Sequence, residues 1–216
     1  MADVSIVLNV HRESTYVRRT IHSLADAALH ARKVGLDTEL VVVLDRSDVA
    51  TINAVKAAQF DGFSVKQFIE IDHGSLGLAR NAGIAASSAD YVWLADADDL
   101  VSANSITAMH AIARDVPRSV IFPEYLVAFG EAYWVARYFD DSIVTAADFA
   151  YGHPYISRIF IRKKDLDGLI FRDLRLSSGF AYEDWHFNSE LRARGMRFCV
   201  ASRTIFFYRQ RKGSLL

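Results

Sequence analysis

Three carboxylates directly follow one short apolar run in the first half of the chain. Asp96, Asp98 and Asp99 come within four residues, straight after Tyr91 to Ala95. Carboxylates this close repel one another where the protein core lowers the dielectric constant, so a cation should neutralise them. Mg²⁺ and Mn²⁺ prefer oxygen ligands and commonly take one or two carboxylates together with phosphate oxygens. The motif predicts a divalent-ion site, and its alternative is an acidic turn that caps the next helix.

A segment with several small residues, Gly74 to Gly83, precedes the acidic motif and contains Arg80. Arg80 offers planar, bidentate donors to a phosphate, while the small residues let a helix lie close to a sheet. The run lacks both the Gly-Lys-Ser/Thr ending of a phosphate loop and a G-x-G-x-x-G pattern, which argues against an ATPase or a nicotinamide dehydrogenase. Close helix packing is an equally good interpretation of the run.

Adjacent carboxylates, Glu183 and Asp184, begin an expected helix in the second half. Acidic residues at a helix start interact favourably with the helix dipole, which is the structural interpretation. The functional interpretation is a general base that takes a proton from a hydroxyl, with Tyr182 and Trp185 shielding one carboxylate from water. His186 is a less favoured candidate for the same role.

Three cations, Arg209, Arg211 and Lys212, follow one another closely near the C-terminus. Such runs usually form solvated tails. They could also fold over an anionic ligand, because Arg and Lys complement phosphate oxygens. The chain stops within a few residues of this expected lid, which is compatible with a truncated catalytic core of a longer protein.

Alternating strands and helices must position these side chains. Strands are expected over Val4 to Val10, Glu39 to Asp45, Ser64 to Ile71 and Asp90 to Asp96, with helices over Tyr16 to Val34, Val49 to Phe60 and Leu76 to Ala86. This alternation predicts an α/β fold with a mostly parallel central sheet and helices on both faces. Ligands of such sheets bind beyond the carboxyl ends of the strands, where most of the polar side chains above fall.

The second half has less regular patterning. Helices are expected over Ser105 to Ala113 and Tyr182 to Arg194, and strands over Ser119 to Phe122, Leu126 to Phe129, Ile156 to Arg162, Phe198 to Ala201 and Thr204 to Tyr208, whereas Tyr133 to Tyr155 is aromatic and irregular. No polar linker divides the chain, so residues 1–216 are expected to form a single domain.

Composition narrows the class of protein. The 216 residues are 51% apolar, and 25 Lys and Arg balance 26 Asp and Glu, which argues against a nucleic-acid-coating protein. The single cysteine excludes an internal disulfide, so a reducing, cytoplasmic location is expected. Apolar runs such as Leu40 to Leu44 are far shorter than the ~20 residues of a membrane span, which leaves peripheral contact with the inner face of a membrane open. The oligomeric state is left open.

Taken in order, these motifs resemble the family 2 glycosyltransferases of the GT-A fold, a Rossmann-like architecture, over essentially the whole chain. Ser5 to Arg12 resembles the first strand and nucleotide-binding turn of that family, and Val41 to Ser47 resembles its second strand. Gly77 to Gly83 is similar to its glycine, arginine and asparagine helix start, and Asp96 to Asp98 to its metal-binding D-x-D. Glu183-Asp184 stands where the family keeps its catalytic base.

The resemblance implies an inverting transferase that moves a sugar from a nucleotide-diphosphate donor to an acceptor hydroxyl. It implies a nucleotide-binding half, residues 1–100, an acceptor-binding half, residues 101–216, and Mn²⁺ or Mg²⁺ at Asp96 and Asp98. It names Asp184 as the base, with Glu183 as its rival. The expected nucleotide-binding residues are Asn9, His11, Arg12, Asp45, Arg80, Asp96, Arg209 and Arg211.

A UDP-sugar is the favoured donor, with His11 beside the uracil and Asp45 accepting its imide hydrogen, and guanine or thymine donors stay open. The acceptor is expected to be a saccharide or a lipid-linked molecule in surface polysaccharide or glycoconjugate synthesis. Aromatic residues that are either core or stacking surfaces for sugar rings are Tyr125, Phe129, Tyr133, Trp134, Tyr151 and Tyr155. The alternatives are a non-catalytic nucleotide-sugar or polysaccharide-binding module and a sugar nucleotidyltransferase.

Overall fold

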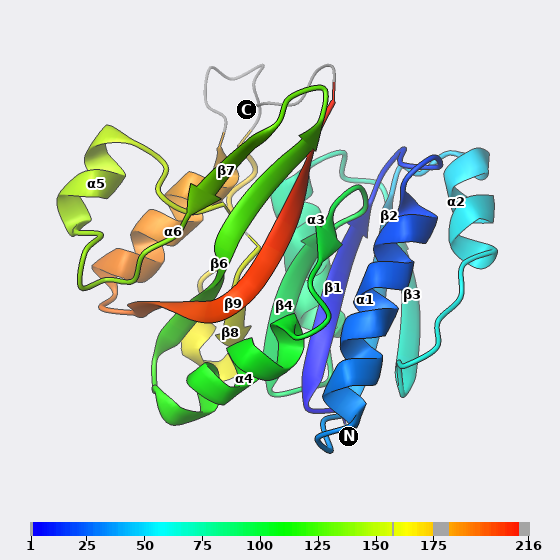
Figure 1. Cartoon of the computed structure of the whole chain (residues 1–216). Coiled ribbons are helices and arrows are strands. Elements are labelled where there is room, and N and C mark those ends of the chain that lie inside the picture. Colours follow the sequence, from blue (N-terminus) through cyan, green and yellow to red (C-terminus); the bar gives the residue numbers. More distant parts are fainter. Residues whose placement is uncertain (1, 157, 175–181, 212–216) are drawn as a thin grey trace.

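Parallel strands form the centre of the molecule. The computed structural model describes residues 2–156, 158–174 and 182–211, and shows β1 (Val4–Val10), β2 (Thr38–Asp45), β3 (Val65–Ile71) and β4 (Tyr91–Asp96) side by side in the order β3-β2-β1-β4 (Figure 1). The connections are helical: α1 (Val17–Arg32), α2 (Val49–Lys56) and α3 (Leu76–Ala86). All three pairings are parallel, so the carboxyl ends of these strands meet at one edge of the sheet. The strands and helices predicted for this half are therefore confirmed, with bounds shifted by a few residues at most.

The second half extends the same sheet beyond β4. Its elements are β5 (Leu100–Val101), α4 (Ser105–Asp115), β6 (Ser119–Gly130), β7 (Trp134–Arg137), α5 (Ala146–Tyr151), β8 (Phe160–Arg162), a 3₁₀ turn (Lys163–Leu166), α6 (Glu183–Ala193) and β9 (Arg197–Gln210). β8 pairs antiparallel with both β4 and β6, β6 pairs in parallel with β9, and β5 and β7 add antiparallel edges. Most strands thus run in one direction, as predicted.

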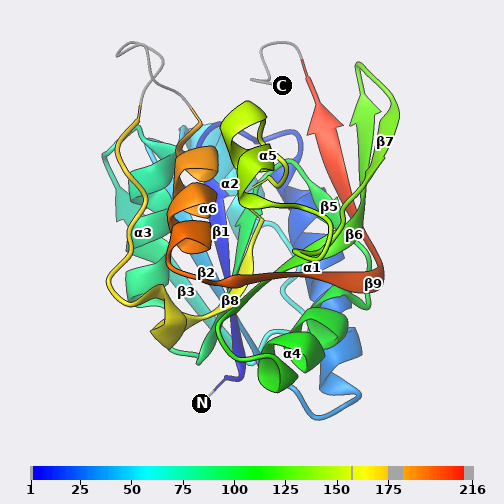
Figure 2. The same ribbon diagram turned by 90° about the vertical axis from the view of Figure 1, so that its left-hand side faces the viewer.

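Two apolar cores cover the two faces of the sheet, because successive side chains of a strand point to opposite faces. Ile6 and Leu8 of β1 pack with α1 and α4 on one face, while Val7 packs with α3 and α6 on the other. Figures 1 and 2 show α1 and α3 on opposite sides of the strands. Both faces are covered, so β1 and β2 are buried along their whole length. Among the described residues, no helix has both the length and the apolar character that crossing a bilayer requires.

Two of the predicted strand breaks are wrong. Ser119 to Phe122 and Leu126 to Phe129 belong to one strand, β6, and the two segments predicted near the C-terminus belong to one strand, β9. The pairing shifts between Pro123 and Tyr125, where the backbone N–H of Glu124 donates to Thr204 Oγ1 and its carboxylate accepts from the N–H of Arg203. These side-chain bonds carry both strands across an irregularity that looks like an end in the sequence.

The irregular aromatic stretch contains β7 and α5 and has two kinds of aromatic residue. Tyr155 is fully buried and stacks on Phe122, so it belongs to the core. Tyr133 and Tyr151 are 80% and 92% exposed. The strand predicted from Ile156 is shorter than expected: β8 begins only at Phe160. Arg158, which precedes β8, lies at the carboxyl end of β4.

Candidate active site

A cleft of about 490 Å³ lies beyond the carboxyl ends of β1, β2 and β4, between the start of α6 and the end of β9. With one exception, every residue that the family resemblance assigns to the site lines it. Arg12 is exposed and does not line the cleft. The predicted residues that line it are Asn9, His11, Asp45, Arg80, Asp96, Asp98, Glu183, Asp184, Arg209 and Arg211.

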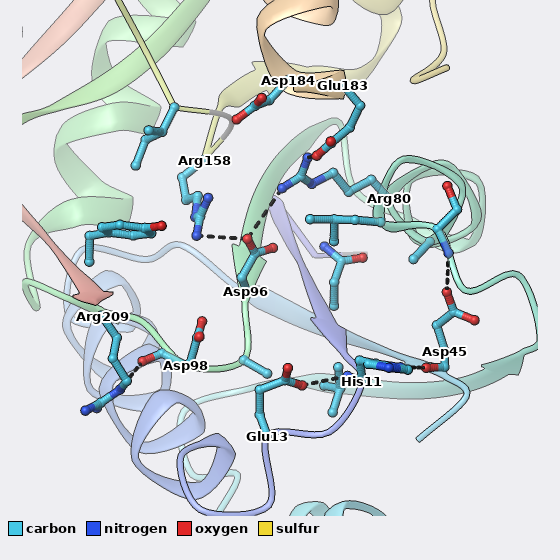
Figure 3. Close-up of a pocket in the computed structure, with 18 of the residues that line it drawn as sticks. His11, Glu13, Asp45, Arg80, Asp96, Asp98, Arg158, Glu183, Asp184 and Arg209 are labelled. Carbon is cyan, nitrogen blue, oxygen red and sulfur yellow. Dashed lines mark hydrogen bonds and ion pairs between the residues drawn. The ribbon is translucent and has the colours of Figure 1, made fainter. Parts of the chain in front are cut away.

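Asp96 lies at the centre of this cleft, between two buried arginines (Figure 3). Its Oδ2 is 2.8 Å from Arg158 Nη2 and 3.4 Å from Arg80 Nη2. Burial by itself would raise the pKa of this carboxyl, but Arg158 and Arg80 outweigh burial and hold the pKa below its ordinary value. Arg80 also stacks over the ring of Phe171, at 5.3 Å from its centroid. Asp96 is therefore a permanently charged anchor for two cations that face the cleft.

Asp98 and Asp99 have the opposite tendency. Burial raises the pKa of Asp98, and the nearby Asp96 carboxylate adds to the effect, although Arg211 opposes it with Nε 3.1 Å from Oδ2. Burial and the same like-charge repulsion raise the pKa of Asp99 to about 7, against the pull of Arg158 at 2.5 Å. The repulsion expected among these three carboxylates is present, and arginines offset it.

The donor set of the cleft fits a hard divalent ion that also takes phosphate oxygens. Two carboxylates, Asp96 and Asp98, line the cleft, and Asp98 already forms an ion pair with Arg211. Mg²⁺ characteristically takes one or two protein carboxylates and fills its other positions with water and phosphate oxygens. In the ranges that the structure describes, no group of three or more His, Cys, Asp or Glu side chains is arranged to hold a metal by itself. An ion bound by Asp96 and Asp98 would therefore keep other ligand positions for water and phosphate oxygens.

Asp45 holds the loop that leads into α3. Its Oδ1 accepts from the backbone N–H groups of His73 (2.8 Å) and Gly74 (2.9 Å), and its Oδ2 accepts from Ser75 (3.1 Å). His11 Nδ1 lies 2.6 Å from the backbone oxygen of Asp45 and so carries the proton there. A carboxylate has about four acceptor positions, and these loop contacts use three of them. Asp45 thus fixes the wall of the cleft on which His11 rests.

Small residues of α3 allow two close approaches. A Cβ on Gly83 would lie 2.2 Å from Val7 Cγ1, and one on Gly77 would lie 2.6 Å from the backbone oxygen of Arg172. Asn81 holds the segment that contains Arg172, because its side chain donates to the backbone oxygen of Phe171 and accepts from the backbone N–H of Phe171. The close-packing interpretation of this run therefore describes its glycines, while Arg80 lies in the cleft.

The two carboxylates at the start of α6 have different partners. Glu183 Oε1 lies 2.6 Å from Arg80 Nη1, so its charge is paired with a buried cation. Asp184 Oδ1 accepts from the backbone N–H of Trp185, and its Oδ2 lies 3.8 Å from His153 Nε2. His186 is 42% exposed, faces Glu190, and does not line the cleft.

The end of β9 crosses the cleft opposite α6. Arg209 donates from its backbone N–H to Asp99 Oδ1 and from Nε to the backbone oxygen of Asp98, and its guanidinium stacks between Tyr16 and Phe129. Arg211 contacts both Asp98 and Glu13. Arg209 and Arg211 thus stay in the cleft through contacts made within the chain. Lys212 lies outside the described residues.

Sequence reasoning missed three residues of the cleft: Glu13, His153 and Arg158. Glu13 accepts a hydrogen bond from the backbone N–H of His11 and pairs with Arg211. Arg158 carried one usable signal, because it interrupts a segment rich in apolar residues, with Ile156 before it and Ile159, Phe160 and Ile161 after it. Burial opposes the charge of Arg158, but Asp96 and Asp99 raise its pKa, so it stays protonated. His153 had no signal, since it lies in the irregular segment.

Two curated relatives match the chain in sequence. The poly(ribitol-phosphate) beta-N-acetylglucosaminyltransferase TarP of Staphylococcus aureus is 24% identical over 127 residues, which are 58% of this chain and 37% of TarP. Glycosyltransferase GlyA of Streptococcus pneumoniae is 22% identical over 232 residues, covering 98% of this chain and 31% of GlyA. The chain therefore spans about a third of the length of these relatives.

Solved structures of S. aureus TarS share the fold. TarS residues 1–349 with UDP-GlcNAc superpose with a TM-score of 0.73 at 18% identity, over 98% of this chain and 60% of that one. The same TarS fragment with UDP gives a TM-score of 0.74 at 17% identity, over 96% and 60%. The α/β domain with its curled, mostly parallel sheet is thus the GT-A fold. The model of the family described as "Glycosyl transferase family 2" matches residues 5–168, and the chain belongs to this family.

Proposed function

We propose that the chain transfers a sugar from a UDP-sugar to an acceptor hydroxyl, with inversion at the anomeric carbon. The observation that carries this proposal is the charge arrangement of the cleft. Four arginines line one cavity with Asp96 and Asp98, and Asp184, which no arginine of the described residues contacts, lines it as well. Guanidinium groups complement diphosphate oxygens, and a carboxylate beside the reacting centre can take a proton. Arg80, Arg158, Arg209 and Arg211 are the four arginines.

The residues of the chain divide the work as follows. His11 and Asp45 form the wall for the uracil ring of the donor, with the imide hydrogen of that ring directed at the Asp45 carboxylate. The arginines balance charge that develops on the departing diphosphate, and because Asp96 and Asp99 fix Arg158 beforehand, little reorganisation is needed. Asp184 takes the proton of the attacking hydroxyl. Attack from the face opposite the leaving group inverts the anomeric centre with no covalent sugar–protein intermediate, which is why one base is enough.

Asp98 and Asp96 would hold Mg²⁺ or Mn²⁺, which as a Lewis acid stabilises a leaving diphosphate when bound. Arg211 must then give up its contact with Asp98. Released from that carboxylate, the guanidinium is near the cleft and can bind a phosphate oxygen.

The relatives support the choice of donor and acceptor. TarS is solved with UDP and UDP-GlcNAc, and TarP is named for transfer of N-acetylglucosamine to poly(ribitol-phosphate). We therefore favour UDP-N-acetylglucosamine among UDP-sugars and a surface polysaccharide or glycoconjugate as the acceptor. Family membership favours glycosyl transfer over nucleotidyl transfer, and turnover of the donor distinguishes a transferase from a binding module.

Thermal unfolding with UDP, in Mn²⁺ or in EDTA, tests the site. A ligand that binds only the native state at 100 times its Kd stabilises that state by about 2.7 kcal/mol. We expect UDP to raise the melting temperature in Mn²⁺ and to raise it much less in EDTA. Asp98→Asn should lose the metal-dependent part, whereas Asp115→Asn, on the exposed end of α4, should keep it. UDP binding that is insensitive to EDTA and unchanged in Asp98→Asn would remove the metal from the proposal, and absence of UDP release from UDP-N-acetylglucosamine would favour a binding module.

A further inference from the structure

His153 lies between α5 and β8 and lines the cleft beside Asp184. Its Nε2 is 3.8 Å from Asp184 Oδ2, and the two side chains are 11% and 16% exposed. The imidazole ring stacks on Trp185, with centroids 5.9 Å apart and planes within 12°. In the described part of the chain, Nε2 is buried and makes no hydrogen bond. A buried polar atom without a partner costs free energy, so its presence in an active-site cleft calls for a functional reason.

Groups from three parts of the fold set the charge of this ring. Burial lowers the pKa of His153 below its ordinary value. Asp184 and Glu183, both at the start of α6, oppose that shift, while Arg80 of α3 and Arg158, which precedes β8, add to it. The imidazole is therefore neutral near pH 7, and a neutral imidazole has one nitrogen that can accept a proton.

We propose that His153 is a relay residue for Asp184, receiving at Nε2 the proton that Asp184 takes from the acceptor. This inference rests on the proposed transfer reaction. As the hydroxyl oxygen bonds to the anomeric carbon, the bond from that carbon to the diphosphate oxygen breaks, and its electron pair leaves with the diphosphate. The hydroxyl proton passes to Asp184 Oδ2, then to His153 Nε2, and from the imidazolium to solvent. Asp184 is again a carboxylate for the next cycle.

The geometry suits a relay that closes during reaction. A distance of 3.8 Å exceeds that of a hydrogen bond, and hydrogen bonds between catalytic groups often tighten only when substrate is bound. The stack on Trp185 fixes the plane of the ring, and Trp185 is itself held by its Nε1–H bond to the backbone oxygen of Phe149.

The test measures UDP release from UDP-N-acetylglucosamine in Mn²⁺, with water as the acceptor, against pH. His153→Phe keeps an aromatic ring on Trp185 but has no proton acceptor, and His153→Gln keeps a polar group but cannot accept a proton as imidazole does. We expect kcat to fall about tenfold or more in both, a smaller loss than the roughly 10²–10⁴-fold expected for a base itself. Affinity for UDP, measured by calorimetry, should not change. His186→Gln is the control, because His186 lies on α6 and is 42% exposed. Its kcat should match that of the wild-type protein.

The pH profile separates a relay from a packing role. The wild-type rate should fall as the pH drops through the pKa of His153, because the imidazolium can accept no further proton. Both variants should lose this acidic limb while they keep their folded state. Equal kcat values and unchanged acidic limbs in both variants would overturn the relay.

A second measurement does not depend on turnover. Removal of the Asp184 charge should lower the pKa of His153, so NMR titration of this histidine ring should show the shift in Asp184→Asn. A His153 that titrates identically in both proteins would overturn the pairing. If the wild-type protein binds no UDP and releases none, the proposed function fails, whereas the titration still decides whether His153 and Asp184 interact.

Discussion

Arginine partners distinguish the two acidic residues that could act as the base. Glu183 is engaged by buried Arg80 at 2.6 Å, so its charge is already balanced by a cation. Asp184 has a backbone N–H and a neutral imidazole beside it, and neither removes its capacity to take a proton. The same logic separates Asp96, which holds two arginines, from Asp98, which lies against Arg211.

Replacing each of these two carboxylates by its amide should therefore give different defects. Asp184→Asn keeps the shape of the side chain but removes its basicity, so kcat should fall by roughly 10²–10⁴-fold with UDP affinity retained. Glu183→Gln leaves Arg80 less well balanced, and breaking a buried pair costs about 3–5 kcal/mol, so that variant should lose stability instead. Steady-state UDP release and urea unfolding measure the two effects. A stable Glu183→Gln with no turnover, beside a fully active Asp184→Asn, would exchange the two roles.

Single secondary-structure elements position these residues by close contact with the sheet. α3 can present Arg80 to the cleft because Gly83 lets its backbone approach β1 and β2, where a Cβ would meet Val7 at 2.2 Å and Val43 at 2.9 Å. β9 reaches the opposite side of the cleft because its pairing with β6 continues past the irregularity at Pro123. Both arrangements depend on backbone geometry more than on the charged side chains they deliver.

Gly83→Val should push α3 away from the sheet. We expect it to destabilise the fold by about 3 kcal/mol, the upper end of the usual cost of overpacking. Gly152→Ala is the matched control, because a Cβ there meets only the Asp148 backbone oxygen at 4.0 Å and the backbone is extended, so its effect should stay within about 0.5 kcal/mol. Urea unfolding measures both variants. If the two glycine variants are equally stable, the close approach of α3 has no energetic importance.

The end of β9 should act differently on the metal and on the nucleotide. Arg211 pairs with Asp98, the carboxylate proposed to bind the ion, so Arg211→Gln should bind Mn²⁺ alone more tightly than the wild-type protein. The same variant lacks a cation for the diphosphate, so it should bind UDP in Mn²⁺ about tenfold more weakly, equivalent to about 1.4 kcal/mol. Isothermal calorimetry measures both affinities. A change of the same sign in both would mean that Arg211 does not exchange between the carboxylate and the phosphate.

At the scale of the whole molecule, the two ends of the sheet have different tasks. The carboxyl ends of the strands carry the cleft, whereas the amino ends carry a buried structural carboxylate, Glu39 of β2. Glu39 accepts hydrogen bonds from Ser5 of β1, from Gln67 of β3 and, at 2.8 Å, from the backbone N–H of Ser88 between α3 and β4. Burial would raise the pKa of Glu39, but these hydrogen bonds outweigh it and hold the pKa below its ordinary value of 4.5.

This pKa shift has a definite sign for stability. A depressed pKa in the folded state means that Glu39 contributes stability fully above its unfolded pKa of 4.5, and that the contribution is lost as the pH falls through the folded value. Glu39→Gln should lower the free energy of unfolding by about 1.5–3 kcal/mol at pH 7. When the pH falls below 4.5, the variant should lose less stability than the wild-type protein, so the difference between the two proteins should shrink. The exposed Glu70→Gln is the control. Urea midpoints between pH 3 and 7 measure the effect, and parallel curves for Glu39→Gln and wild type would contradict it.

The amino-acid sequence by itself determined the strands and helices of the first half, the class of fold and the family. Periodicity within β1 to β4 and α1 to α3 is local, and both faces of β1, β2 and β4 are mostly apolar because helices cover both. Prediction from local patterns divided β6 and β9 wrongly. The hydrogen bond that carries the pairing past the irregularity joins Glu124 to Thr204, 80 residues further along the chain.

Only the tertiary structure decided how the charges of the cleft are paired. Asp96, Asp98, Glu183 and Asp184 are all recognisable in the sequence, but their partners come from distant segments. Arg80 meets Glu183 across 103 residues, and Arg158 meets Asp99 across 59. The energy of a buried charge depends on the distance to its partner and on the exclusion of water, and both arise only when the chain is folded.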